Sequence, residues 1–155
     1  MDRRAIVRVE EAPFDAATET ARLTRGRTDI GALVSFTGLC RDEGGALAAL
    51  EIEHYPGMAE AEIGRVAASA LARWRLAGVL IVHRYGRIAP GEPIVLVAAA
   101  SAHRAEAFEA AAFMMDFLKS GAPFWKKGRS AAGGADAGWV AAEPQDEAAA
   151  AKWRA

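Results

Sequence analysis

The stretch from Pro93 to Ala100 is the strongest constraint on the fold, because it is apolar throughout. A continuous apolar run of this length is typical of a central strand that is covered on both faces. The turn residues Ala89-Pro90-Gly91-Glu92 precede it, and a helix is predicted from about His103 to Leu118. We therefore expect a buried central strand that leads directly into a long helix.

Further strands and helices are predicted on both sides of this unit. The expected strands are 6–9, 30–40, 47–55, 79–82 and 139–140. The expected helices are 15–24, one that begins after Pro56-Gly57 and carries an apolar stripe from Ile63 to Trp74, and 146–154. Strands 30–40 and 47–55, joined by the polar loop 41–45, predict a long antiparallel hairpin. Because strands and helices mix without regular βαβ alternation, the class is α+β, with helices packed on a mixed or antiparallel sheet.

The predicted helix from His103 is apolar on more than one face. Its inner stripe is expected to consist of Phe108, Ala111, Ala112, Met115 and Leu118. Phe113, Met114 and Phe117 lie on its other faces. Such a helix is either deeply buried or packed against another subunit.

Length, charge and cysteine content exclude several classes of protein. At 155 residues and 16.4 kDa the chain fits one domain, 1–155, with a mobile loop at 130–138 and a C-terminal helix or tail at 146–155. A net charge of -1 argues against a nucleic-acid-binding module. The single cysteine, Cys40, excludes an intrachain disulfide and a cysteine-rich metal site. No apolar run approaches the roughly 18 residues of a membrane span, so we expect a soluble, cytoplasmic protein.

Two basic clusters, 101–104 and 119–127, flank the predicted helix. A rise of about 1.5 Å per residue separates them by roughly 25 Å, so one site cannot easily use both. Either there are two sites, or two copies of the chain each lend one end to a shared pocket. Cations at the helix start, His103 and Arg104, oppose the preference of the helix dipole and suggest a bound anion.

The residues of the second cluster also have ordinary structural interpretations. Lys119 suits the negative end of the helix dipole, and Phe124-Trp125 could be core. Gly121 and Pro123 favour a tight turn that returns the chain toward the helix end. Lys126 and Lys127 are adjacent, so in an extended segment only one of them should face a pocket shared with Lys119. Arg41 is by default a solvated arginine, and Cys40 a small buried hydrophobe.

Several short motifs, taken in order, resemble the large catalytic subunit of molybdopterin synthase. They are Phe36-Thr37-Gly38-Leu39-Cys40-Arg41, Glu53-His54-Tyr55-Pro56-Gly57-Met58, His83-Arg84-Tyr85-Gly86, Pro90-Gly91-Glu92, Ser101-Ala102-His103-Arg104, Ala107-Phe108 and 119–126. The resemblance runs from about Ile6 to Trp139. It implies an α/β-hammerhead fold and a homodimer. A small ubiquitin-like subunit would bind each end of the dimer, giving a heterotetramer.

The resemblance also implies a reaction and a set of site residues. The reaction transfers sulfur from the small subunit's C-terminal thiocarboxylate to cyclic pyranopterin monophosphate, forming the molybdopterin dithiolene. Lys119 and Lys126 would be catalytic, and His103 and Arg104 would reach the pocket across the dimer. The implied substrate-binding residues are Leu39, Cys40, Arg41, His103, Arg104, Lys119, Lys126, Lys127 and Gly128. No metal and no cofactor are implied. Because a thiocarboxylate supplies the nucleophilic sulfur, the enzyme needs cations and a proton donor rather than a cysteine of its own.

Two other classes of function remain open at this point. One is a non-catalytic dimeric adaptor that captures a ubiquitin-like tail and a phosphorylated ligand. The other is a generic domain that binds a phosphorylated ligand without any protein partner.

Overall fold

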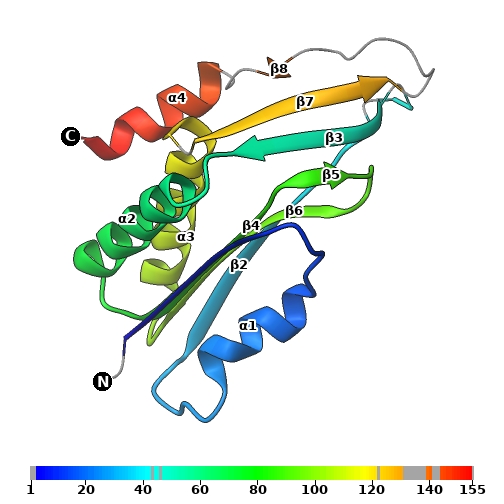
Figure 1. The fold of residues 1–155 in the computed structure, drawn as a ribbon. Helices are drawn as coiled ribbons and strands as arrows, with labels where there is room; N and C mark the ends of the chain where they lie inside the picture. The colour runs from blue at the N-terminus through cyan, green and yellow to red at the C-terminus, as the bar shows by residue number, and fades with distance from the viewer. Residues whose placement is uncertain are drawn as a thin grey trace.

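The structure is a computed structural model in two four-stranded sheets with helices packed against them (Figure 1). It describes residues 3–42, 44–45, 47–121, 123–130, 139–140 and 144–154. The strands are β1 (Arg4–Glu10), β2 (Ala32–Leu39), β3 (Leu47–His54), β4 (Leu76–Arg84), β5 (Gly86–Ile88), β6 (Pro93–Ser101), β7 (Phe124–Ser130) and β8 (Trp139–Val140). The helices are α1 (Ala16–Thr24), α2 (Met58–Arg73), α3 (Arg104–Gly121), α4 (Pro144–Ala151) and the short 3₁₀ helix η1 (Lys152–Arg154).

The first sheet has the order β1-β4-β6-β2, with β1 parallel to β4 and the other pairs antiparallel. β6 lies between β4 and β2, and its residues from Ile94 to Ser101 are buried. All nine residues of β4 are buried as well. The prediction of a central strand covered on both faces is therefore confirmed.

Helices cover this sheet on both sides, α1 on one face and α2 with α3 on the other (Figure 1). Alternating residues of a strand point to opposite faces, which divides the core in two. Leu80 of β4 packs with Leu23 of α1. Val79 packs with Ile63 of α2 and Met114 of α3. The fold is thus α+β, as predicted.

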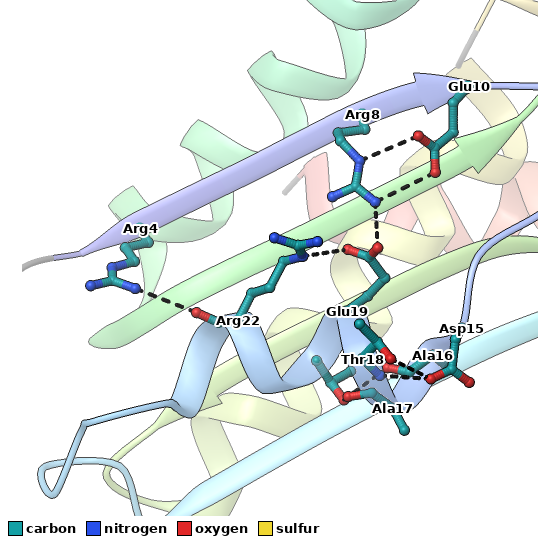
Figure 2. Close-up of polar contacts among 10 residues, drawn as sticks. Arg4, Arg8, Glu10, Asp15, Ala16, Ala17, Thr18, Glu19 and Arg22 are labelled. Atoms are coloured by element: carbon teal, nitrogen blue, oxygen red, sulfur yellow. Dashed lines mark hydrogen bonds and ion pairs between the residues drawn. The ribbon is translucent and has the colours of Figure 1, made fainter. Parts of the chain in front are cut away.

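Polar contacts hold α1 against β1 (Figure 2). Asp15 caps the helix by accepting hydrogen bonds from the backbone N–H and the hydroxyl of Thr18, at 3.0 and 2.6 Å. Glu19, only 7% exposed, pairs with Arg8 of β1 at 2.7 Å and with Arg22 at 3.1 Å. The hydrogen bond from Arg8 is the main reason that the pKa of Glu19 is lowered.

The second sheet has the order β5-β3-β7-β8 and corrects the predicted hairpin. β2 pairs with β6 in the first sheet, whereas β3 pairs with β5 and β7, so strands 30–40 and 47–55 are not partners. At the end of β2 the Cys40 N–H donates to the Glu92 carbonyl at 2.9 Å, and the Gly91 N–H donates to the Cys40 carbonyl. These bonds tie β2 to the turn before β6. The hairpin prediction was wrong because the alternation of apolar and polar residues along a strand does not specify which strand it pairs with.

The predicted inner stripe of the long helix is also partly wrong. Phe108 is 61% exposed and Ala112 is exposed, whereas Phe113 and Met114 are buried. The stripe is rotated because α3 packs on two helices, α2 and α4, as well as on the strands β6 and β2.

The C-terminal predictions are confirmed where the structure describes them. β8 occupies the predicted short strand, and α4 with η1 forms the terminal helix. The mobile loop expected at 130–138 lies outside the described residues except for Ser130, which ends β7. Within the described part of the chain, no helix is long and apolar enough to cross a membrane.

Candidate active site

The end of α3 and the start of β7 bring two lysines together. Lys119 lies in the last turn of α3, which ends at Gly121, and β7 begins at Phe124. Lys119 is exposed, whereas Lys126 is partly buried. Burial lowers the pKa of Lys126, and the neighbouring cation of Lys119 lowers it further. Two residues separate the end of α3 from the start of β7, and the two lysines share one electrostatic environment.

Strand pairing explains why Lys126 is buried. β7 runs antiparallel to β3, and Lys126 lies directly opposite Ile52, which is 1% exposed. Residues directly opposite one another project from the same face of a sheet. The inner face of the second sheet thus carries Ile52 and Lys126. Trp125 belongs to the other face, where it is 40% exposed and meets Tyr55 edge-on at 4.7 Å.

A layer of aromatic rings and imidazoles lies beside the lysines. The ring of His83 in β4 stacks on Phe124 with centroids 3.8 Å apart and planes 12° from parallel. His54 of β3 lies 4.2 Å from the ring of Tyr85 and 6.2 Å from Phe124. This layer connects β4 of the first sheet with β3 and β7 of the second, so it fixes the position of β7 just before Lys126.

His83 is the site residue to which the sequence assigned no role. Its Nδ1 lies 2.8 Å from the Arg84 carbonyl oxygen, so Nδ1–H donates and Nε2 carries the lone pair of the neutral ring. Burial lowers the pKa of His83 to about 4, and Lys126 and Lys119 contribute to the lowering. The imidazole is therefore neutral near pH 7. The only sequence signal was its place in the motif His83-Arg84-Tyr85-Gly86.

The segment that ends β2 supplies three predicted substrate residues with different exposure. Leu39 is 58% exposed and Arg41 is exposed, whereas Cys40 is 3% exposed with Sγ 3.8 Å from the Ile88 carbonyl oxygen. The prediction of Cys40 as a small buried hydrophobe is confirmed. Cys40 also acts electrostatically on Lys126, raising its pKa against the larger effect of burial, so this segment belongs to the surroundings of the lysines.

Two further predicted site residues follow Lys126 in β7. Lys127 pairs through its backbone with Glu51 of β3 and Trp139 of β8, and Gly128 pairs with Leu50 and is buried. Lys126 interacts electrostatically with Lys119.

The remaining predicted residues lie at the far end of α3. His103 and Arg104 are both exposed at the helix start. Eighteen helical residues at about 1.5 Å each separate them from the lysines by roughly 25 Å. The structure therefore does not bring His103 and Arg104 to Lys119 and Lys126 within one chain.

No group of three or more His, Cys, Asp or Glu side chains suited to a metal ion occurs among the described residues. What the site offers is a pair of lysines, one of them partly buried, beside a layer of stacked rings that includes the neutral imidazole of His83. Such an arrangement can hold an anion and exchange a proton with it. Fold and site together define an α+β protein with a paired-lysine candidate site.

Comparison with known proteins gives the family. Residues 9–121 match the family model described as MoaE protein. A molybdopterin synthase catalytic subunit from Mesorhizobium japonicum is 62% identical over 148 residues, which cover 96% of this chain and 92% of that protein. A solved MoaE protein from Burkholderia ambifaria superposes with a TM-score of 0.82 at 43% identity, covering 97% of this chain and 99% of that one. Molybdopterin synthase from Staphylococcus aureus superposes with a TM-score of 0.73 at 28% identity, covering 84% of this chain and 95% of that one. The chain belongs to the MoaE family, so the resemblance drawn from the motifs is confirmed.

Proposed function

We propose that this chain transfers sulfur from the C-terminal thiocarboxylate of a small ubiquitin-like partner to cyclic pyranopterin monophosphate, forming the molybdopterin dithiolene in the cytoplasm. The observation that carries the proposal is the pair formed by Lys119 and a partly buried Lys126 with a lowered pKa. The names of the relatives, molybdopterin synthase catalytic subunits, support the same reaction.

The two lysines differ in their surroundings and so in their proposed roles. A free lysine has a pKa of about 10.4 and is a poor proton donor at neutral pH. Burial and the Lys119 cation bring the pKa of Lys126 down, so Lys126 is the proposed acid that protonates the departing oxygen of the pterin. Lys119 is exposed at the end of α3, which suits it to contact the anionic substrate.

The sulfur itself needs no nucleophile from this chain. Cys40 is 3% exposed and lies in the core against Ile88. A reactive cysteine is normally at least partly accessible and ionised. Burial of the single cysteine therefore supports a sulfur donor on the partner, where the thiocarboxylate anion supplies the attacking sulfur.

The anion site of the proposal is completed by a second copy of the chain. Arg41 stands at the end of β2, whereas His103 and Arg104 lie about 25 Å from the lysines of their own chain. Phe108 of α3 and Phe36 of the edge strand β2 are large, apolar and exposed, as expected of a surface that packs on another subunit. In a homodimer, the start of each α3, with His103 and Arg104, would contribute to one pocket, and its end, with Lys119, would contribute to the other.

The direct test supplies the purified chain with a thiocarboxylated small subunit and the pyranopterin, and measures dithiolene. Lys119→Ala and Lys126→Ala should each abolish product formation while small-subunit binding, measured by titration calorimetry, stays within about twofold. Lys127→Ala is the matched control at the neighbouring position and should retain most of kcat. Loss of partner binding in proportion to activity in the two lysine variants would favour the adaptor instead.

Mixing two inactive variants tests the shared pocket. Lys119→Ala and the double variant His103→Ala, Arg104→Ala are refolded together so that the chains exchange at random. Half of the dimers are then mixed, and one of their two pockets is intact, so about a quarter of wild-type activity should return. No recovery, with dimers shown by light scattering, would mean that both ends of α3 act within one chain or in separate sites.

A further inference from the structure

The C-terminal segment 139–154 contacts both elements that carry the site lysines. β8 pairs with β7, where Val140 lies opposite Lys126. After β8 the chain continues into α4 and η1, which pack against α3 (Figure 1). This segment lies outside residues 9–121, the part of the chain that matches the family model.

Trp153 of η1 makes a short polar contact with α3. Its indole Nε1–H donates to Oδ2 of Asp116 at 2.6 Å. Nζ of Lys152 lies 3.6 Å from the same oxygen. The backbone carbonyl of Trp153 accepts a hydrogen bond from Arg73 of α2 at 2.9 Å. The end of the chain is thereby fixed to two helices at once.

Apolar packing holds the Trp153 ring in this position. The ring meets Trp74 and Phe113 edge-on, with centroids 5.7 and 5.6 Å apart. The Arg73 guanidinium lies 5.0 to 5.5 Å from the centroids of all three rings. Because these contacts do not involve the indole N–H, the ring can stay in place when only the hydrogen bond to Asp116 is removed.

The position of Asp116 gives this hydrogen bond a consequence for the site. Asp116 precedes Lys119 by three residues on α3, a spacing at which side chains are neighbours and opposite charges pair. Among the described residues, however, its carboxylate contacts Trp153 and Lys152, and no ion pair joins it to Lys119. Trp153 thus binds the α3 carboxylate that lies nearest to Lys119 in the sequence.

We propose that Trp153 is a positioning residue for the sulfur transfer proposed above: by holding the Asp116 carboxylate, it leaves Lys119 to face Lys126. Charged and titratable groups lie near this pair on several elements. They are Asp116 on α3, Lys152 on η1, His83 on β4, His54 on β3, Asp146 on α4 and Cys40 after β2. Of these, Asp116 is the one whose direction Trp153 controls.

The test replaces Trp153 by Phe, which keeps an aromatic ring but removes the donor. The freed Asp116 should pair with Lys119, weaken its effect on Lys126 and raise the pKa of Lys126. We expect kcat to fall roughly two- to fivefold and the kcat–pH profile to move to higher pH. The apparent KM for the pterin should rise as well, because Lys119 is also the proposed contact for the anionic substrate. Asp116→Asn added to Trp153→Phe should restore kcat and the profile, because no carboxylate is left to pair.

Trp74→Phe is the matched control. Trp74 belongs to the same aromatic cluster, and its indole N–H donates to Glu109 Oε2 at 2.9 Å, ten residues before Lys119. The Trp74→Phe variant loses an indole hydrogen bond in the same cluster, so it should lower the free energy of unfolding without moving the kcat–pH profile. If Trp153→Phe shifts nothing, or if Asp116→Asn does not rescue it, Trp153 is only a packing residue.

A second measurement does not depend on activity. Lysines labelled with ¹³C-methyl groups and followed by NMR report the titration of Lys119 and Lys126 directly, and Trp153→Phe should shift the midpoint of Lys126 upward. An unchanged midpoint overturns the inference. Absence of dithiolene formation by the wild-type protein would instead overturn the proposed function, so the two failures are distinguishable.

Discussion

The free energy of unfolding should fall less between pH 7 and pH 5 when His83 is replaced with Phe than it does in the wild-type protein. In the folded protein the pKa of His83 is lowered from 6.5 to about 4, mainly by burial. Below pH 6.5 His83 is therefore protonated in the unfolded chain but stays neutral in the folded protein, and falling pH favours unfolding. Stability from this group is fully present above pH 6.5 and is lost progressively down to about pH 4.

The size of the effect follows from the two pKa values. Linkage with values of 6.5 and about 4 gives a loss of about 2 kcal/mol between pH 7 and pH 5, and about 3 kcal/mol when His83 is fully protonated in both states. Phe has no titratable group and can keep the stack on Phe124. It loses the hydrogen bond to the Arg84 carbonyl, about 1 kcal/mol at every pH, so the comparison rests on the slope and not on the absolute stability.

Urea unfolding at pH 7, 6 and 5 measures the slope, provided that the transition is two-state with a constant m-value. His103→Gln is the matched control, since its ring is exposed at the start of α3, and it should keep the wild-type slope. If His83→Phe loses as much stability between pH 7 and pH 5 as the wild type does, the buried neutral imidazole is not the cause of the acid sensitivity.

Three further changes test the site and the scaffold. Cys40→Ala should retain most dithiolene formation when thiocarboxylated partner is supplied, because Cys40 is a packing residue; a folded variant that binds partner and substrate but makes no product would contradict this. Gly31→Ala should lower the free energy of unfolding by about 1–3 kcal/mol in urea, because its Cβ would collide with the Ala102 carbonyl oxygen, and wild-type stability would show that the close approach is not enforced. Glu19→Gln should lower the free energy of unfolding by about 1–3 kcal/mol at pH 7, because it removes the charge pair with Arg8. This difference from the wild type should shrink as pH falls through the lowered pKa of Glu19, and thermal unfolding at several pH values measures it. A difference that stays constant with pH would argue against the charge pair.

What the sequence could predict depended on whether the determining interaction was local. The apolar run 93–100 predicted β6 because burial on both faces leaves its mark on every residue of the strand. The hairpin prediction was wrong because β2 pairs with β6, and the backbone hydrogen bonds that Cys40 exchanges with Gly91 and Glu92, about fifty residues away, extend that pairing. Phe108 was misplaced for a similar reason, since the packing of α3 on α2 and α4 is not encoded in its own periodicity.

The same distinction applies to the candidate site. Proximity of Lys119 and Lys126 was predictable, because only a short turn separates them and Gly121 and Pro123 favour its reversal. The neutral state of His83 was not predictable, because it arises from burial in β4 and a stack on Phe124, forty-one residues further along the chain. No local pattern distinguishes such a histidine from a solvated one.

Strand register decides which of two adjacent lysines can act as the acid. The pairing of Lys126 with Ile52 places it on the inner face of the second sheet, where it is partly buried, and the pairing of Lys127 with Glu51 follows from the same register. A shift of one residue would exchange the two faces and bring Lys127 opposite Ile52. The proposed catalytic difference between two chemically identical side chains therefore lies in the β3–β7 register. That register is held by the stack of His83 on Phe124 at the start of β7 and by the pairing of Lys126 with Val140 of β8.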